Sequence, residues 1–181
     1  MKYRITSETK VVGNITLHRI ECVTAFGDVE RGEKGGWIES EKNLSQSGNA
    51  WVYESAVVSE NAWAGENAWV GGNAWVGGNA RVGDNARVGG NATISGNAIV
   101  RGNAIVSGNA DCIVFKNWWS SGRYFTWTRS NNKWTVGCFY GSGEELIAKA
   151  YKDSEKSGRE YERVVKYVND ILKEEDNEAV I

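Results

Sequence analysis

The sequence carries little net charge, has few cysteines and one histidine, and contains no long apolar run. Its 181 residues have a formal net charge of −2, which gives no overall field to attract nucleic acid or an anionic membrane. We therefore expect no direct DNA binding. No run of eighteen apolar residues occurs, and the first five residues lack the core of a signal peptide. These absences predict no membrane span and a cytoplasmic location.

Few residues are available for metal binding or catalysis. Cys22, Cys112 and Cys138 are scattered without metal-ligand spacing, so we interpret them as reduced packing residues and expect no metal or cofactor. His18 lies in a strand-like segment and is interpreted as structural. No phosphate-binding P-loop, Gly-x-Ser-x-Gly elbow or His/Cys cluster occurs. No catalytic residue is therefore expected.

What the sequence does contain is a six-residue repeat, Gly-Asn-Ala-x-Val-x, from Gly48 to Ala110. Alanine recurs at every sixth position, and a large aliphatic residue usually follows two positions later. An even period suits a β-strand, in which alternate residues share a face, and does not suit a helix. Gly and Asn tolerate the left-handed backbone region and are typical of corners. The repeat therefore predicts a mainly β protein built on a parallel β-solenoid, with coils about 4.8 Å apart.

The pattern Val-Gly-Gly-Asn-Ala-x resembles the hexapeptide-repeat family. That resemblance implies a left-handed parallel β-helix with three hexads in each triangular coil, although the repeat alone does not fix the handedness. The segments 17–20 (Leu-His-Arg-Ile) and 35–44 (Gly-Gly-Trp-Ile-Glu-Ser-Glu-Lys-Asn-Leu), together with the repeat, are similar to hexapeptide-repeat proteins of phages and prophages. Such proteins carry generic labels such as polymer-forming protein or transferase. The resemblance brings no settled activity.

The repeat divides the chain into three parts. Residues 1–34, with strand-like stretches at 2–6 and 15–26, are expected to form an N-terminal β cap, because the open end of a solenoid needs a cover. Residues 35–116 are expected to form the β-helix, with a register slip of two residues before the regular coils begin. Residues 117–181 are expected to form a small α+β module.

The module is predicted from turn, capping and periodicity signals. The stretches 123–128 and 133–140 flank a turn and predict a β-hairpin. Ser142 and Glu145 have capping-box spacing for a helix that runs to about Ser154. We expect Gly158 to break the chain before a second helix, 159–173, and the tail from residue 174 to be frayed. The second helix has an apolar stripe expected to pack on the hairpin: Tyr161, Val164, Val165, Val168, Ile171 and Leu172.

Eighteen-residue coils would place each residue beneath the one eighteen positions later. The outward position after each alanine then gathers tryptophans in the first coils, with arginines one coil beyond. These residues are the candidate oligomer interface: Trp51, Trp63, Trp69, Trp75, Arg81 and Arg87. Self-association, as the homotrimer that hexapeptide proteins commonly form, is the first interpretation. Packing under the cap and a ligand-stacking platform are the alternatives.

The segment 116–143 contains four basic residues and no acidic one. Its candidate ligand-binding residues, which could line pockets between subunits of a trimer, are Arg123, Trp127, Arg129, Lys133 and Trp134. A cationic aromatic pocket suits an anionic, nucleotide-like ligand. Alternatively, the aromatic residues form the core of the module and the charges are solvated.

We therefore expect a non-catalytic oligomeric binding protein of phage or prophage type, acting in the host cytosol. As a countermeasure to host defence, it would sequester an anionic nucleotide-like signal or bind a host protein. A hexapeptide-family acyltransferase and a purely structural or assembly protein are the alternatives. Acyltransferases with this repeat usually place a catalytic histidine beside the coenzyme A groove, and no histidine follows His18 here.

Overall fold

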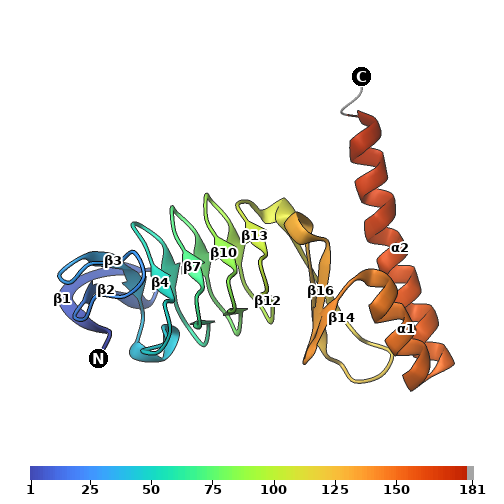
Figure 1. Ribbon diagram of the computed structural model, residues 1–181, viewed down its shortest axis with the longest axis horizontal. Helices are drawn as coiled ribbons and strands as arrows, with labels where there is room; N and C mark the ends of the chain where they lie inside the picture. The colour runs from blue at the N-terminus through green and yellow to red at the C-terminus, as the bar shows by residue number, and fades with distance from the viewer. Residues whose placement is uncertain (179–181) are drawn as a thin grey trace.

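The computed structural model describes residues 1–178 and shows a β-solenoid shaft between an N-terminal β cap and a C-terminal module (Figure 1). The predicted parallel β-solenoid, followed by a sheet and two helices, is confirmed. The shaft is built from two-residue strands joined by corners. They are β4 (Trp51–Val52), β5 (Val57–Val58), β6 (Trp63–Ala64), β7 (Trp69–Val70), β8 (Trp75–Val76), β9 (Arg81–Val82), β10 (Arg87–Val88), β11 (Thr93–Ile94), β12 (Ile99–Val100) and β13 (Ile105–Val106).

The coil length is eighteen residues on all three faces of the shaft. Strands stack in the orders β4-β7-β10-β13, β6-β9-β12 and β5-β8-β11, and Trp69 pairs with Arg87, eighteen positions later. Before the regular coils, Trp37 pairs with Val57, twenty positions later. The predicted coil length and the predicted slip of two residues are therefore both confirmed.

Small and large residues alternate inside the shaft, and amides stack along its corners. The repeat alanines from Ala50 to Ala104 and the aliphatic residues two positions after them are buried. At one corner, Nδ2 of Asn61 donates to Oδ1 of Asn79 at 3.2 Å, and Asn79 donates in turn to Asn97 at 3.3 Å. Such ladders give the side-chain amides of successive coils hydrogen-bond partners and fix the register of each coil on the next.

Acidic residues occupy several corners in a left-handed backbone conformation. Glu60, Glu66 and Asp84 have φ between 52° and 58°, where glycine is usually preferred. Each of their carboxylates accepts a hydrogen bond from a backbone N–H of the next coil. These charge-assisted hydrogen bonds offset the cost of the unusual conformation.

The cap is an antiparallel extension of one shaft sheet. Strands β1 (Tyr3–Val12), β2 (Ile15–Cys22) and β3 (Lys34–Ile38) continue the β5-β8-β11 sheet in the order β1-β2-β3-β5. The 3-10 helix η1 (Glu41–Asn43) follows. The predicted boundary after residue 34 falls inside β3, because this strand pairs with the cap on one edge and with the shaft on the other.

The cap supplies donors to the first coil. Along the shaft, N–H groups at the corners and at the first residue of each strand donate to carbonyl oxygens of the next coil, so the equivalent carbonyl oxygens of the first coil need donors from elsewhere. Nζ of Lys2 donates to O of Ala50 at 2.7 Å, and Nδ2 of Asn43 donates to O of Ala62 at 2.8 Å. These contacts close the N-terminal end of the shaft.

The buried amine of Lys2 should make stability depend on pH. Burial lowers its pKa from 10.5 to about 8, an effect that the charge of Cys22 partly offsets. Between about pH 8 and 10, the unfolded chain keeps a proton that this amine releases in the folded protein, so the free energy of unfolding should rise with pH. Burial raises the pKa of Tyr3, and this group acts in the opposite direction above its usual value of 10.0.

Denaturant unfolding of the wild-type protein and of Lys2→Met across that window measures the effect. The wild-type free energy of unfolding should rise more steeply with pH than that of the variant. Equal slopes would show that the Lys2 amine is solvated.

The C-terminal module begins earlier than predicted. Strands β14 (Cys112–Lys116), β15 (Tyr124–Thr128), β16 (Lys133–Val136) and β17 (Phe139–Gly141) form one antiparallel sheet in chain order. The prediction that 111–116 finishes the last coil is wrong, because β14 pairs with β15. The predicted hairpin strand 133–140 is instead two strands, divided at Gly137, where φ is 56°.

Two helices cover the far side of this sheet (Figure 1). Helix α1 (Gly143–Asp153) begins with the predicted capping box of Ser142 and Glu145. Helix α2 (Glu155–Glu178) begins before Gly158, so the predicted break at this glycine is wrong. A Cβ on Gly158 would meet the ring of Tyr151, so the glycine lets α1 pack closely on α2. The tail from residue 174, expected to be frayed, is helical to residue 178; the last three residues lie outside the described part.

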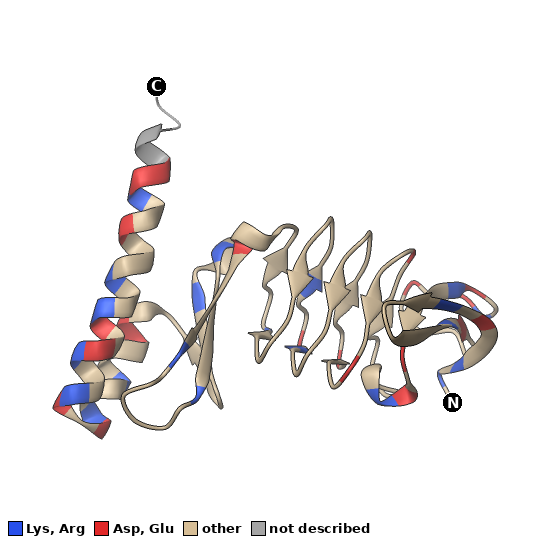
Figure 2. Ribbon diagram, turned by 180° about the vertical axis from the view of Figure 1, so that it is seen from behind, with Lys and Arg blue, Asp and Glu red and all other residues tan. Residues whose placement is uncertain are grey.

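The apolar stripe of α2 packs on the sheet as predicted. Tyr161, Val165 and Val168 are buried in one cluster with Phe125 and Trp134, and further stripe residues are partly buried against it. Figure 2 shows that charged residues crowd these helices and the cap, whereas most of the shaft ribbon is uncharged.

The module and the 3-10 helix η2 (Asn109–Asp111) before it supply acceptors to the last coil. Thr93, Ile99 and Ile105 are the first residues of the three strands in the last coil. Their N–H groups have no further coil to which they can donate. Oδ1 of Asn109 accepts from Thr93 at 2.7 Å, Oγ1 of Thr126 from Ile99 at 2.9 Å, and Oγ of Ser130 from Ile105 at 2.7 Å. On each face of the shaft, one side-chain oxygen therefore caps the last strand.

Thr126→Val should lower the free energy of unfolding by about 1–3 kcal/mol, because it keeps the side-chain shape but leaves a largely buried N–H without an acceptor. Thr135 pairs with Thr126 across the sheet, and its hydroxyl makes no hydrogen bond within residues 1–178. Thr135→Val is the matched control and should lose much less. Urea denaturation of both variants measures the difference, and equal losses would contradict the capping role.

Candidate functional site

The first tryptophan of the predicted interface is inaccessible. Trp51 is fully buried, and its ring makes edge contacts with Tyr3 and Phe26 at centroid distances of 6.2 and 5.5 Å. The side chain lies on the same face as Trp69, its ladder partner, but the cap covers it. Its assignment to an oligomer interface is wrong, and the alternative of packing under the cap is correct for this residue.

The other three tryptophans of the shaft are half-buried and lie against glycines. A Cβ on Gly65 or Gly71 would collide with the indole of Trp63 or Trp69, two residues earlier. The ring of Trp69 also contacts that of Tyr53, with centroids 5.3 Å apart and the planes tilted by 31°. Trp75 packs at the edge of a small cluster with Leu17, Trp37 and Val57. Arg81 and Arg87 are exposed one coil beyond Trp63 and Trp69. Self-association through these residues stays a prediction.

The predicted ligand residues of the module separate into a buried and an exposed group. Trp127 and Trp134 are 1% exposed in the core of the module, and Nε1 of Trp127 donates to Oδ1 of Asn132 at 2.8 Å. Their assignment to a stacking pocket is wrong, because the sheet needs both rings as core. Arg129 pairs with Glu175 at 2.6 Å, and Lys133 is half-buried on β16. Arg123 is exposed.

Arg81 and Arg123 line the same groove between the shaft and the module. This junction groove has a volume of about 470 Å³ and carries no carboxylate in its lining. Neither arginine forms a salt bridge within the described residues. The groove is lined by Asn61, Asn79, Arg81, Asn97, Ile99, Arg123, Tyr124 and Gly137. Two guanidinium groups and a row of amides make it rich in hydrogen-bond donors.

A second hollow adjoins the junction groove beneath the overhanging edge of β14 and β15. This coil-end recess has a volume of about 330 Å³ and is uncharged. It is lined by Thr93, Ile94, Ser95, Gly96, Asn97, Ala98, Cys112, Val114 and Tyr124. Asn97 and Tyr124 line both spaces, so the two hollows are neighbours.

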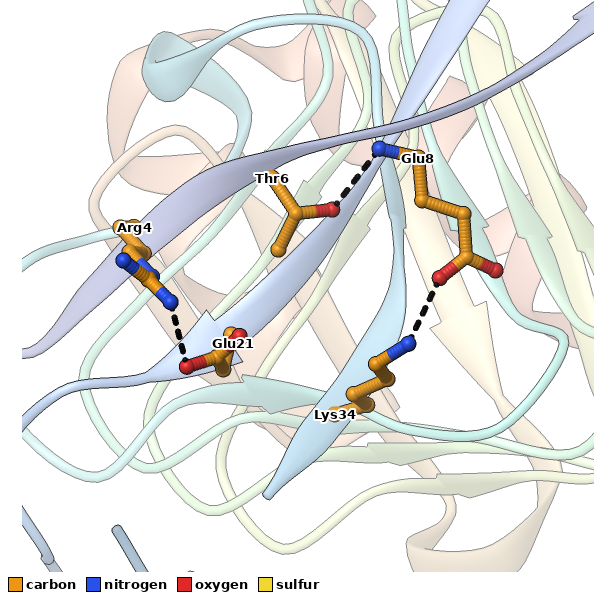
Figure 3. A network of polar contacts seen from close by, with 5 residues as sticks. All are labelled: Arg4, Thr6, Glu8, Glu21 and Lys34. Carbon is orange, nitrogen blue, oxygen red and sulfur yellow. Dashed lines mark hydrogen bonds and ion pairs between the residues drawn. The ribbon is translucent and has the colours of Figure 1, made fainter. Parts of the chain in front are cut away.

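The cap carries a polar hollow of a different kind. Arg4 pairs with Glu21 at 2.9 Å and Lys34 pairs with Glu8 at 3.0 Å, next to the irregular middle of β1 (Figure 3). The charges of opposite sign neutralise one another, and exposed ion pairs contribute about 0–1 kcal/mol. This hollow has no excess of either charge with which to attract an ion.

The histidine lies away from the junction groove, and the thiol of Cys112 in the coil-end recess is held neutral. His18 lies on β2 and pairs with Ile38 in the cap, at the opposite end of the shaft (Figure 1). Burial, with a smaller contribution from Asp111, raises the pKa of the Cys112 thiol to about 12, so this thiol stays protonated at neutral pH. Cys138 is exposed, which corrects its interpretation as a packing residue.

The described part of the chain lacks both a candidate metal site and a candidate membrane span. Within it, no cluster of three or more His, Cys, Asp or Glu side chains has an arrangement that could hold a metal ion. None of its helices is both long and apolar enough to cross a membrane.

Comparison with known proteins gives one partial similarity. No family model matches the sequence. The sequence is 33% identical to the uncharacterized acetyltransferase YdcK of Escherichia coli (strain K12) in an alignment 66 residues long that covers 32% of this chain. The matched region spans only 20% of that protein.

Proposed function

We propose that this protein is a non-catalytic binding protein that holds an anionic ligand in the junction groove. The observation that carries the proposal is the convergence of Arg81, from the shaft, and Arg123, from the module, on one groove without a carboxylate in its lining. Unpaired guanidinium groups on a surface of mixed charge are a preferred partner for phosphate and carboxylate groups. The nucleotide-like signal expected from the sequence belongs to this class of ligands.

The shaft gives the groove a fixed geometry. Asn79 and Asn97 belong to an amide ladder, and Arg81 sits on a strand paired on both edges. Thr126 of β15, two residues from Tyr124, is bound to the last coil. A rigid site loses less entropy on binding than a mobile one, which favours affinity for a small ligand.

The biological setting remains that predicted from the sequence. In the cytosol of a phage host, such a protein would sequester an anionic signal of the host defence. The exposed face with Trp69 and Arg87 would serve either a homotrimer or a host protein. A purely structural role would require neither the groove nor its arginines.

A transferase of the hexapeptide family is the second candidate, favoured by the similarity to an acetyltransferase over 66 residues. That reaction needs a base near the acceptor, and His18 lies at the far end of the shaft. Titration with acetyl-coenzyme A, followed by an acetyl-transfer assay with amine and hydroxyl acceptors, separates the two functions. If the protein transfers acetyl groups and a substitution in the junction groove abolishes this activity, the transferase function replaces the binding proposal.

Arg81→Gln and Arg123→Gln should each weaken anion binding by about tenfold or more, because each removes charge-assisted hydrogen bonds. Isothermal titration with inorganic pyrophosphate at low salt measures the effect. Arg87→Gln is the matched control, since Arg87 is an exposed arginine on the neighbouring face. The proposal fails if pyrophosphate and other phosphate compounds give no binding heat, or if Arg87→Gln weakens binding as much as the other two substitutions.

A further inference from the structure

The hydrogen-bonding pattern of the corners leaves amide donors at the C-terminal end of the shaft. In the preceding coil, the N–H groups of Gly77 and Asn79 donate to carbonyl oxygens of the next coil at 2.8 and 2.7 Å. The equivalent groups of the last coil belong to Ser95 and Asn97. Neither of these N–H groups makes a hydrogen bond within residues 1–178, in contrast to the capped N–H groups of Thr93 and Ile99.

The side chain of Asn97 ends its ladder in the same place. Its Oδ1 accepts from Nδ2 of Asn79, and the position eighteen residues later is Phe115, which has no acceptor in its side chain. In the described chain, Nδ2 of Asn97 therefore has no acceptor. Asn97 lines both the junction groove and the coil-end recess, and Ser95 lines the recess.

Charge and donors are thus distributed unequally over the two neighbouring hollows. The junction groove carries both guanidinium groups, whereas the coil-end recess is uncharged and combines N–H groups, hydroxyls and aliphatic side chains. The ring of Tyr124, which is 37% exposed, lines both, and Nζ of Lys116 lies 5.6 Å from its centroid. A ligand that matches this arrangement has an anionic group at one end and a flat, neutral ring with acceptor atoms at the other.

We propose that the ligand is a nucleoside phosphate, with its phosphate beside Arg81 and Arg123 and its base in the coil-end recess against Tyr124. This inference rests on the proposed binding function and adds the ligand class and the role of the recess. Nucleobases offer a π face for stacking and acceptor atoms along their edges. Those acceptors match the amides of Ser95 and Asn97, which the truncated ladder leaves available.

Isothermal titration with the four common nucleoside 5′-monophosphates, ribose 5-phosphate and the four nucleosides tests the inference. At least one nucleotide should bind about tenfold or more tightly than ribose 5-phosphate and than its own nucleoside. Tyr124→Ser should weaken nucleotide binding by about tenfold more than it weakens binding of ribose 5-phosphate, whereas Tyr124→Phe, which keeps the ring, should retain most of the difference in affinity between nucleotide and ribose 5-phosphate.

Asn97→Asp is the sharper variant. It keeps an oxygen for Asn79 but replaces the free donor with a second acceptor and adds a negative charge, so nucleotide affinity should fall by about tenfold or more. Asn103→Asp makes the same change at the end of another ladder, away from both hollows, and should bind like the wild-type protein.

The outcomes separate the inference from the function on which it rests. Ribose 5-phosphate that binds as tightly as every nucleotide, with both losing affinity in Arg81→Gln, would overturn the nucleoside assignment and leave the anion site standing. Equal affinities of Asn97→Asp and Asn103→Asp would also overturn the role of the recess. The absence of binding by any phosphate compound would overturn both proposals.

Discussion

Trp51→Ala should lower the free energy of unfolding by about 3–5 kcal/mol, the usual cost of removing a large buried aromatic side chain. The indole is fully buried between the first coil and the cap, where it contacts Tyr3 and Phe26. Its loss would leave a cavity under the cap that the rigid shaft below cannot fill by collapsing. Chemical denaturation monitored by circular dichroism measures the change.

Trp69→Ala is the matched control for this prediction. Trp69 pairs with Trp51 in the next coil and carries the same side chain, but it is half-buried at the surface. Trp69→Ala should lower the free energy of unfolding clearly less than Trp51→Ala does. The difference between the two losses is the contribution of the cap. If the two variants lose equal stability, the cap does not seal Trp51.

Gly35→Ala should also be severely destabilising, by about 3 kcal/mol, the upper end of the usual cost of overpacking. A Cβ at this position would lie 2.6 Å from Cγ1 of Ile20, from Cζ2 of Trp51 and from the carbonyl oxygen of Val52. The oxygen belongs to the backbone of the first coil and cannot move aside. The cap strand β3 would therefore have to lift from the shaft.

Gly108→Ala provides the control for Gly35→Ala. Gly108 has an extended backbone with φ of −149°, and a Cβ there would meet no atom within 4 Å. This variant should change stability by less than about 0.5 kcal/mol, as surface substitutions usually do. Thermal unfolding of both variants distinguishes steric conflict from a general effect of replacing glycine, which would appear as equal shifts in Tm.

The shaft could be predicted from the sequence because each structural rule acts there over short distances. An even period, small and large residues in alternation and corner residues recur in every hexad, so the coil length follows from spacing alone. The slip after Leu44 was visible for the same reason. In contrast, β14 was assigned to the last coil, because an apolar strand of five residues suits a coil as well as a sheet, and only its pairing partner decides.

The candidate site was predicted only in part. Arg123 was named for ligand binding and Arg81 for an interface, but the two lie in one groove. No sequence period relates the module to the shaft, so their meeting could not be derived. Trp127 and Trp134 were misassigned because alternation in a strand identifies a shared face without telling which face is buried. The end of the amide ladder at Asn97 was a signal available in the sequence, since position 115 is not asparagine.

The repeated coils allow the shaft to change in length by whole coils while the cap and the module still fit its two ends. Every coil presents the same set of hydrogen-bonding groups to the coil before it and another constant set to the coil after it, so the cap and the module would meet the same chemistry after the removal or insertion of a whole coil. A change of eighteen residues would alter the spacing between the two end pieces by about 4.8 Å without turning one relative to the other. A change of a single hexad would move one end piece to the next side of the triangle. Natural variation in length should therefore occur in steps of three hexads.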